Sequence, residues 1–234
     1  MAKERGRNTY HIADTNERAV PQRLRLEQEL RHAIAAQQFV LYFQPQVSLA
    51  SGRVEACEAL LRWRKDDGTM VSPGQFIPIL EDTGQIVAVG EWVLHEACSA
   101  LRAWRERGRD GVRVSVNVSP RQFEDGDLIG QVKSALAAHR LAPADLELEI
   151  TEGMLVRDTS RTNATLTALK HLGVRLAIDD FGTGYSSLSY LQRFKVDTLK
   201  VDRSFVSSIG GDDKHAAMAS AVIDLGHRPG LTVV

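Results

Sequence analysis

Short runs rich in Val, Ile and Leu alternate along this chain with segments of helical periodicity, and this alternation limits the folds that it can adopt. The runs lie at 39–47, 53–63, 112–119, 146–151, 174–179, 198–202 and 231–234. Strands that alternate with helices form βαβ units and a mainly parallel sheet. Only residues 48–52 separate the first two runs, so these are expected to form an antiparallel hairpin. The fold class is therefore α/β, either a barrel or a doubly wound sheet.

Polar residues occupy one face of several of these predicted strands. The alternating positions include Glu58 and Arg62, Ser115 and Asn117, Glu147 and Glu149, and Thr198, Lys200 and Asp202. Helices cover the outer face of a parallel sheet, so several polar faces in one such sheet need another explanation than solvent. A barrel supplies it, because polar residues then line the mouth at the C-terminal strand ends. We therefore favour a barrel over a doubly wound sheet.

The composition is that of an ordinary soluble globular protein. The 234 residues are 43% hydrophobic and 25% charged, which allows one large domain or two small ones. A net charge of −1 and a pI near 6.7 argue against a surface that binds nucleic acid or anionic membranes. No apolar stretch approaches the roughly 18 residues of a membrane span, and the N-terminus lacks the apolar core of a signal peptide.

The C-terminal ends of the predicted strands carry a set of oxygen ligands. At the barrel mouth these would be Glu58, Asn117, Glu149, Asp179 and Asp180, with Lys200 nearby. Four carboxylates and one amide, without thiol or imidazole, suit Mg²⁺ or Mn²⁺ better than zinc. Adjacent aspartates can let one carboxylate bridge two ions about 3.5–4 Å apart, as in two-metal phosphoester hydrolysis. For single residues the alternatives are a helix cap for Asp180 and a surface lysine partner for Glu149.

Five motifs in this sequence together resemble one family. They are EALLRW, SVNVSP, ELEITEG, AIDDFGTGYSSLSYL and LKVDRSF, and they follow the order and spacing of the EAL-domain phosphodiesterases. The resemblance covers residues 24–234. It implies a TIM-like (β/α) barrel with one antiparallel strand, which hydrolyses cyclic di-GMP to linear pGpG with two Mg²⁺ or Mn²⁺ ions.

The resemblance also implies roles for individual residues. One metal would be held by Glu58, Asn117, Glu149 and Asp179, and the second by Asp179 and Asp180. Lys200 resembles the residue that orients the attacking water, and Glu152 and Asp202 are further catalytic candidates. An ordinary first-turn helix acid is the alternative for Glu152.

The candidate substrate-binding residues are Gln44, Leu60 and Arg62. Arg62 lies two positions beyond Leu60 on the inward face, where its guanidinium can make a forked contact with a phosphate. A salt bridge that closes the barrel is the alternative for Arg62.

The chain is expected to begin before the EAL domain and to stop before the last elements of that domain. Residues 1–12 resemble the end of a GGDEF domain, of the kind that synthesises cyclic di-GMP, and residues 13–23 are expected to be a linker. The EAL domain at 24–234 stops before a motif resembling AEGVE, whose first glutamate would bind the second metal, and before the final strand and helices. We therefore expect an incomplete barrel, poorly stable and weakly active or inactive.

Three functions stay open at this stage: a phosphodiesterase, a non-hydrolytic cyclic di-GMP receptor and an interaction module. The presence of every predicted metal ligand up to the C-terminus, together with Lys200, favours the enzyme. The expected partners are cyclic di-GMP, a second copy of the EAL domain and a preceding GGDEF domain, without a DNA or RNA duplex. The expected location is the cytoplasm, although N-terminal regions of a full-length protein could provide a membrane anchor.

Overall fold

The computed structural model describes residues 19–156, 160–182, 194–206, 213–227 and 230–234. The strands are β1 (Phe39–Val47), β2 (Val54–Arg64), β3 (Met70–Val71), β4 (Arg113–Asn117), β5 (Leu146–Thr151), β6 (Arg175–Phe181), β7 (Thr198–Val201) and β8 (Thr232–Val233). The helices are α1 (Ala19–Ala35), α2 (Pro73–Asp82), α3 (Ile86–Glu106), α4 (Pro120–Asp125), α5 (Leu128–His139), the 3₁₀ helix η2 (Pro143–Asp145), α6 (Glu152–Val156), α7 (Ser160–Leu172), α9 (Arg203–Val206) and α10 (Asp213–His227). Each of the seven predicted apolar runs contains a strand.

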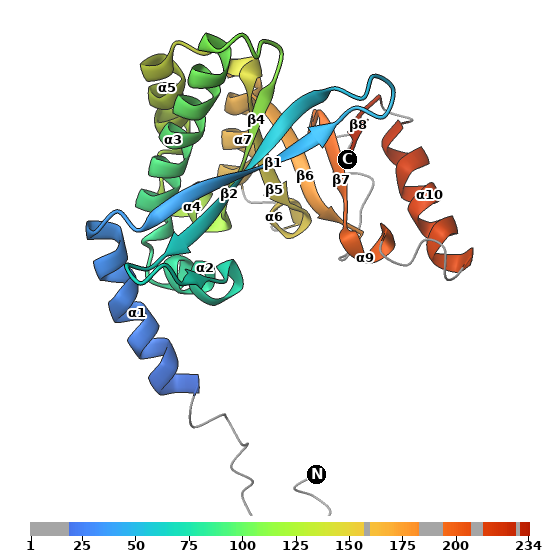
Figure 1. The fold of residues 1–234 in the computed structure, drawn as a ribbon. Coiled ribbons are helices and arrows are strands. Elements are labelled where there is room, and N and C mark those ends of the chain that lie inside the picture. The colour runs from blue at the N-terminus through green and yellow to red at the C-terminus, as the bar shows by residue number, and fades with distance from the viewer. Residues whose placement is uncertain (1–18, 157–159, 183–193, 207–212, 228–229) are drawn as a thin grey trace, which may run out of the picture.

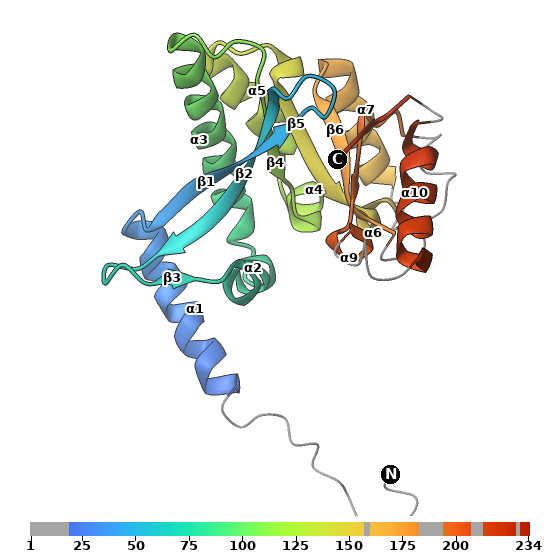
Figure 2. The same cartoon turned by 45° about the vertical axis from the view of Figure 1, so that its right-hand side comes forward.

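The strands form one curled sheet in the order β1-β2-β4-β5-β6-β7-β8, with β3 beside β2 (Figures 1 and 2). β1 pairs antiparallel with β2, and the later neighbours from β2 to β8 pair in parallel. The order follows the chain and has no switch point, which is the pattern of a barrel rather than of a doubly wound sheet. The prediction of a TIM-like barrel with one antiparallel strand is confirmed for this strand order, and the two-residue β3 beside it is also antiparallel to β2. Within the described residues the sheet is open, since β1 and β8 each pair with one neighbour.

The apolar face of the sheet packs against the helices. Val114, Leu148, Ile178 and Leu199, each from a different strand, are at most 1% exposed. They belong to one core with the buried residues of α3, α5 and α7. Each such side chain contributes about 1.5–3 kcal/mol through burial. This core fixes which face of every strand is left to point inward.

The inward face is polar, as the alternation predicts. Ser115, Glu147, Glu149 and Thr198 are all at most 2% exposed. Neighbours in register include Ser115 beside Glu147 and Asn117 beside Glu149. Polar side chains buried at this depth need partners within the protein. The interior is therefore a place where charges must be balanced by other side chains or by a ligand.

The N-terminal part of the chain only partly matches the expected layout. The predicted GGDEF remnant at 1–12 lies outside the described residues. α1 begins at Ala19, so residues 19–23 of the predicted linker are helical. In the described part of the chain, no helix is both long and apolar enough to cross a bilayer.

Candidate active site

Four charged side chains from four strands converge at the C-terminal end of the sheet. The ammonium of Lys200 on β7 lies 3.0 Å from Oε2 of Glu58 on β2 and 3.2 Å from Oδ2 of Asp179 on β6. It also donates a hydrogen bond to Oε2 of Glu149 on β5. One oxygen from each of the three carboxylates lies within 4.8 Å of the other two. Residues 142 positions apart in the sequence are thus in direct contact.

Asn117 extends this cluster from the end of β4. Its side-chain Nδ2 donates a hydrogen bond to Oε1 of Glu58 at 2.7 Å. Glu58 is therefore held on one oxygen by the amide and on the other by Lys200. The structure brings together four of the five predicted metal ligands and the predicted catalytic lysine.

Burial and charge set the protonation of the two most enclosed groups. Burial raises the pKa of Glu149 from its ordinary value of 4.5 to about 7, the charge of Lys200 opposes the rise, and the charge of Glu58 adds to it. Burial alone lowers the pKa of Lys200, but the charges of Glu149, Asp179 and Glu58 outweigh it and raise the pKa. The ammonium stays protonated at neutral pH, and the carboxylates around it outnumber it.

The donor set fits a divalent metal ion. The three carboxylates and the amide of Asn117 are hard oxygen ligands without a soft or imidazole donor. Oε1 of Glu149 is buried and accepts no hydrogen bond from the residues that the structure describes. An unsatisfied, buried carboxylate oxygen is costly unless a cation satisfies it. The cluster can therefore hold a metal ion, with Glu58, Glu149 and Asp179 as the core of the site.

An irregularity in β6 changes the backbone direction at Asp180. The strand was expected to end at Asp179, but it continues to Phe181, with a register shift against β7 between Ile178 and Phe181. Asp180 adopts a left-handed backbone, with φ of 53°, and its N–H donates to Oδ1 of Asp179 at 3.0 Å. Burial raises the pKa of Asp180, and the nearby charges of Asp179 and Asp202 raise it further. Both adjacent carboxylates thus lie near the same site, and Asp180 is part of a strand rather than a helix cap.

Two further predicted residues lie at the ends of β5 and β7. Oε2 of Glu152, the first residue of α6, accepts a hydrogen bond from the N–H of Gly182 at 3.3 Å. Gly182 has φ of 100°, which favours glycine, and a Cβ there would lie 2.7 Å from the ring of Phe205. Glu152 therefore links β5 to the start of the segment after β6. Asp202 accepts hydrogen bonds from the backbone and hydroxyl of Ser204, and these lower the pKa of Asp202.

The predicted substrate-binding residues form a wall beside the cluster. Gln44 on β1 lies opposite Glu58 in the antiparallel register, and Leu60 follows Glu58 two positions along β2. Arg62, the next inward residue, donates from Nη1 to the carbonyl of Leu61 at 2.9 Å. No carboxylate among the described residues pairs with Arg62, so the structure does not show the alternative salt bridge.

The motifs and this geometry agree with a single family. The family model described as "EAL domain" matches residues 27–234. The chain belongs to the EAL domain family. The matched region contains every predicted site residue.

Several relatives of this EAL domain carry names that state an activity. The bifunctional diguanylate cyclase/cyclic di-GMP phosphodiesterase MucR of Pseudomonas aeruginosa is 42% identical over 234 residues, which are 100% of this chain and 34% of MucR. The cyclic di-GMP phosphodiesterase NbdA of the same organism is 41% identical over 213 residues, 91% of this chain and 27% of NbdA. The chain thus spans about a third or less of these curated relatives.

A solved structure supports the fold at the same level of similarity. It is described as "PaMucR Phosphodiesterase, c-di-GMP complex", is 42% identical and superposes with a TM-score of 0.85. The match covers 89% of this chain and 85% of that chain. The curled sheet of this EAL domain is therefore the family's barrel fold.

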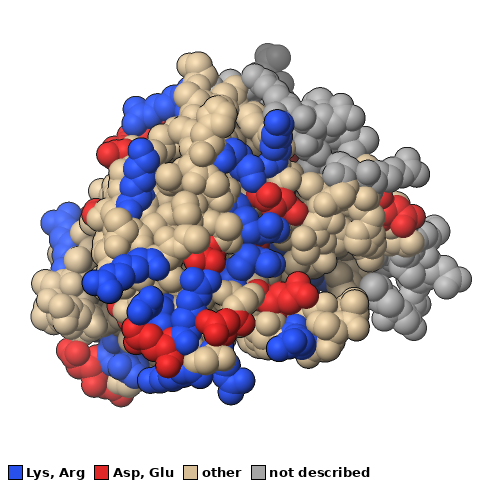
Figure 3. Space-filling model, turned by 90° about the horizontal axis from the view of Figure 1, so that it is seen from above, with Lys and Arg blue, Asp and Glu red and all other residues tan. Residues whose placement is uncertain are grey.

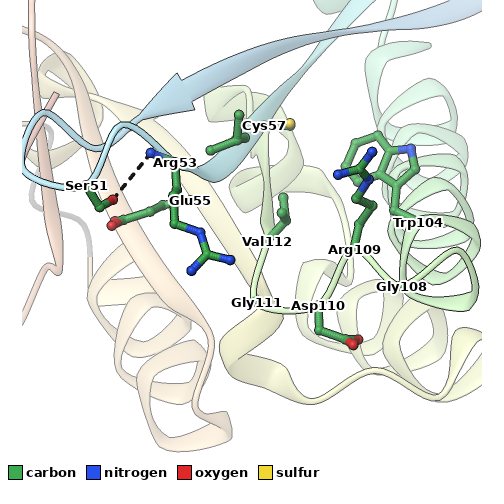
Figure 4. A pocket seen from close by; sticks show the side chains of 11 residues that line it. Ser51, Arg53, Glu55, Cys57, Trp104, Gly108, Arg109, Asp110, Gly111 and Val112 are labelled. Atoms are coloured by element: carbon green, nitrogen blue, oxygen red, sulfur yellow. Dashed lines mark hydrogen bonds between the residues drawn. The ribbon is translucent and has the colours of Figure 1, made fainter.

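A separate cavity of about 770 Å³ lies at the opposite end of the sheet, between the β1–β2 turn and the α3–β4 loop. Arg53 and Arg109 enter it from opposite sides, and Glu55 and Asp110 also line it (Figure 4). Basic and acidic side chains are interspersed on this face (Figure 3). Burial raises the pKa of the Cys57 thiol in its wall, which disfavours a reactive thiolate. None of the predicted site residues lines this cavity, so the chemistry of this EAL domain is not expected here.

The sequence motifs did not single out Tyr42, which the structure places beside the site. Tyr42 lies opposite Leu60 in the β1–β2 register, and the guanidinium of Arg62 lies 5.9 Å from its ring centroid. The spacing in the sequence could have identified Tyr42, because it lies two positions before Gln44 and therefore on the same face of β1.

Proposed function

We propose that this chain is the catalytic domain of a metal-dependent phosphodiesterase that hydrolyses cyclic di-GMP to linear pGpG. The observation that carries the proposal is the convergence of Glu58, Glu149 and Asp179 on one point, beside Lys200. MucR and NbdA are named cyclic di-GMP phosphodiesterases, and the solved MucR phosphodiesterase is a c-di-GMP complex. The carboxylate and amide ligands favour Mg²⁺ or Mn²⁺ as the ion.

The metal ligands and Lys200 divide the chemistry. A bound divalent ion would supply Lewis-acid chemistry, polarising the phosphodiester and making a water molecule more acidic. Glu58, Asn117, Glu149 and Asp179 would hold the first ion, and Asp179 with Asp180 would hold the second. Lys200 remains protonated, so it acts as a hydrogen-bond donor that orients the attacking water rather than as a base.

The reaction consumes one water molecule. Its oxygen forms the new bond to phosphorus, the bond from phosphorus to O3′ breaks, and O3′ leaves as a hydroxyl. Arg62, which has no carboxylate partner among the described residues, would contact a substrate phosphate, with Gln44 and Leu60 beside it. Glu152 would position the segment after β6 through Gly182, and Asp202 would add negative charge beside Asp180.

The direct test is turnover of cyclic di-GMP by Glu58→Ala in the full-length protein, in the presence of Mn²⁺. Loss of a direct metal ligand should abolish pGpG formation. The matched control is Glu55→Ala, because Glu55 lies three residues earlier on β2, is exposed and lines the opposite cavity. Unchanged turnover in Glu58→Ala would overturn the metal assignment. A full-length protein that binds cyclic di-GMP without hydrolysing it would instead indicate a receptor.

The remaining assignments, which concern the domain bounds, the location and the oligomeric state, follow from the family. We infer a domain that begins near residue 24, after a GGDEF remnant at 1–12 and a linker at 13–23 whose last five residues belong to α1. We also infer a cytoplasmic location and a homodimer formed through the EAL domain. Sedimentation with and without cyclic di-GMP would test the dimer. A GGDEF domain is the expected neighbour in the full protein, as the name of bifunctional MucR suggests.

A further inference from the structure

Tyr42 is an aromatic residue on the inward face of β1 that contributes little to the core. Its exposed fraction is 53%, whereas those of Phe39 and Trp63 on the same two strands are 8% and 1%. The neighbouring Phe43 points to the other face and packs edge-on against Trp104, with centroids 4.8 Å apart. Core packing therefore accounts for an aromatic residue at position 43, but it does not account for the exposed ring of Tyr42.

The ring of Tyr42 lies beside a positioned cation. The guanidinium carbon of Arg62 is 5.9 Å from the ring centroid, within the range of a cation–π interaction. The hydrogen bond from Arg62 to the Leu61 carbonyl holds the guanidinium in place. The described residues offer Arg62 no carboxylate, so its charge is available to an anion. The guanidinium thus lies over one face of a ring that is half exposed, which leaves ring surface for a ligand beside the guanidinium.

We propose that Tyr42 is a substrate-contact residue whose ring stacks on a guanine of cyclic di-GMP while Arg62 contacts the phosphate. The inference rests on the proposed function, because it names a further contact in the same site. A nucleotide presents its base and its phosphate one ribose apart, which matches a ring and a guanidinium that lie next to each other. Stacking uses the π-face of the base and needs no further polar group on the protein.

The test is calorimetric titration of the full chain with cyclic di-GMP in Ca²⁺, which is expected to allow binding without turnover. Tyr42→Ala and Tyr42→Leu should each raise Kd about tenfold, which is within the range for losing one base stack. Tyr42→Phe keeps the ring and should bind within about twofold of wild type. Leu49→Ala in the same hairpin is the control, because Leu49 is fully exposed at the turn and should leave Kd unchanged.

The outcomes separate this inference from the proposed function. If the wild-type chain does not bind cyclic di-GMP, the proposed function fails and the inference fails with it. If the wild type binds and Tyr42→Leu binds equally well, only the stacking contact is overturned. Binding by Tyr42→Phe as weak as that of Tyr42→Ala would assign the contact to the hydroxyl and would also overturn stacking. Thermal unfolding of each ligand-free variant checks that Kd changes do not come from a damaged fold.

Discussion

Two buried glutamates on the same face of β5 have opposite surroundings. Glu147 is 2% exposed, and its Oε2 accepts hydrogen bonds from Arg175 at 3.0 Å and from Thr198 at 2.8 Å. Glu149 is 1% exposed and shares a single ammonium, that of Lys200, with two other carboxylates. Both glutamates are equally enclosed, yet only the second lies in a group where negative charges outnumber positive ones.

The comparison shows that burial of a carboxylate does not by itself mark a functional site. Near the amino ends of the strands, the guanidinium of Arg175 and a hydroxyl balance the one carboxylate, as expected of a structural ion pair. At the carboxyl ends the charge is unbalanced, and Oε1 of Glu149 has no partner in the described part of the chain. The first layer, Glu147 with Arg175 and Thr198, is therefore stabilising. The second layer, formed by Glu58, Glu149, Asp179 and Lys200, keeps an excess of negative charge that lowers stability when no metal ion is bound.

The largest expected difference between the two layers is in catalysis. Glu149→Gln removes a metal ligand and should lower kcat for cyclic di-GMP by about a thousandfold or more. Glu147→Gln should leave kcat of the folded fraction nearly unchanged, because Glu147 lies below the site. The measurement is pGpG formation by the full-length protein in Mn²⁺, normalised to folded protein. Comparable losses in the two variants would mean that the layers are not functionally distinct.

In stability the order should reverse. Glu147→Gln leaves the partly buried guanidinium of Arg175 without its carboxylate partner and should lower the free energy of unfolding by about 1–3 kcal/mol. Glu149→Gln should not lower it, because it removes a surplus negative charge. Urea unfolding in a chelator measures both values. A larger loss in Glu149→Gln than in Glu147→Gln would contradict the assignment of roles.

The cations of the two layers provide the third contrast. Lys200→Ala should lower kcat about a hundredfold with little change in affinity, because its ammonium acts on the attacking water. Arg175→Ala should lower the free energy of unfolding instead.

Arg62→Ala should weaken cyclic di-GMP binding with the fold intact, since Arg62 contacts the ground-state phosphate. Calorimetry in Ca²⁺ separates the cases, and a large affinity loss in Lys200→Ala would show that its role is substrate binding.

The smallest expected effect is a pH dependence of the metal-free protein. The pKa of Glu149 is raised to about 7, so the folded state holds its proton more tightly than the unfolded state does. Its contribution to stability is therefore complete below about pH 4.5 and is lost as the pH rises through about 7. Between those limits wild type should lose stability relative to Glu149→Gln, whose side chain does not titrate. Parallel stability profiles for the two proteins would exclude this source of pH dependence.

Much of the fold could be predicted from the sequence because its periodicity is local. Alternation within each run gave the polar inward face, and the short turn at 48–52 gave the antiparallel hairpin. The end of β6 was misplaced because the left-handed conformation of Asp180 and the register shift beside it depend on pairing with β7. Such a bulge has no signal in the spacing of apolar residues.

The metal ligands could be predicted from the sequence, but the contacts that distinguish them from neighbouring polar residues could not. Alternation placed Glu147 and Glu149 on one face without separating their roles, since the partners of Glu147 come from strands 28 and 51 residues away. Tyr42 shared its spacing with Gln44, and only the β1–β2 register brought its ring to Arg62. In both cases the missing information was which side chains from distant strands become neighbours.

The most direct test of the account is a calorimetric titration of Mn²⁺ into three proteins: wild type, Glu149→Gln and Glu147→Gln. It measures metal binding itself, without depending on turnover or on the substrate. We expect Mn²⁺ to bind to wild type and to the folded fraction of Glu147→Gln, and to bind at least tenfold more weakly to Glu149→Gln. Equal Mn²⁺ affinity in wild type and Glu149→Gln would contradict the claim that the unbalanced layer is the metal site.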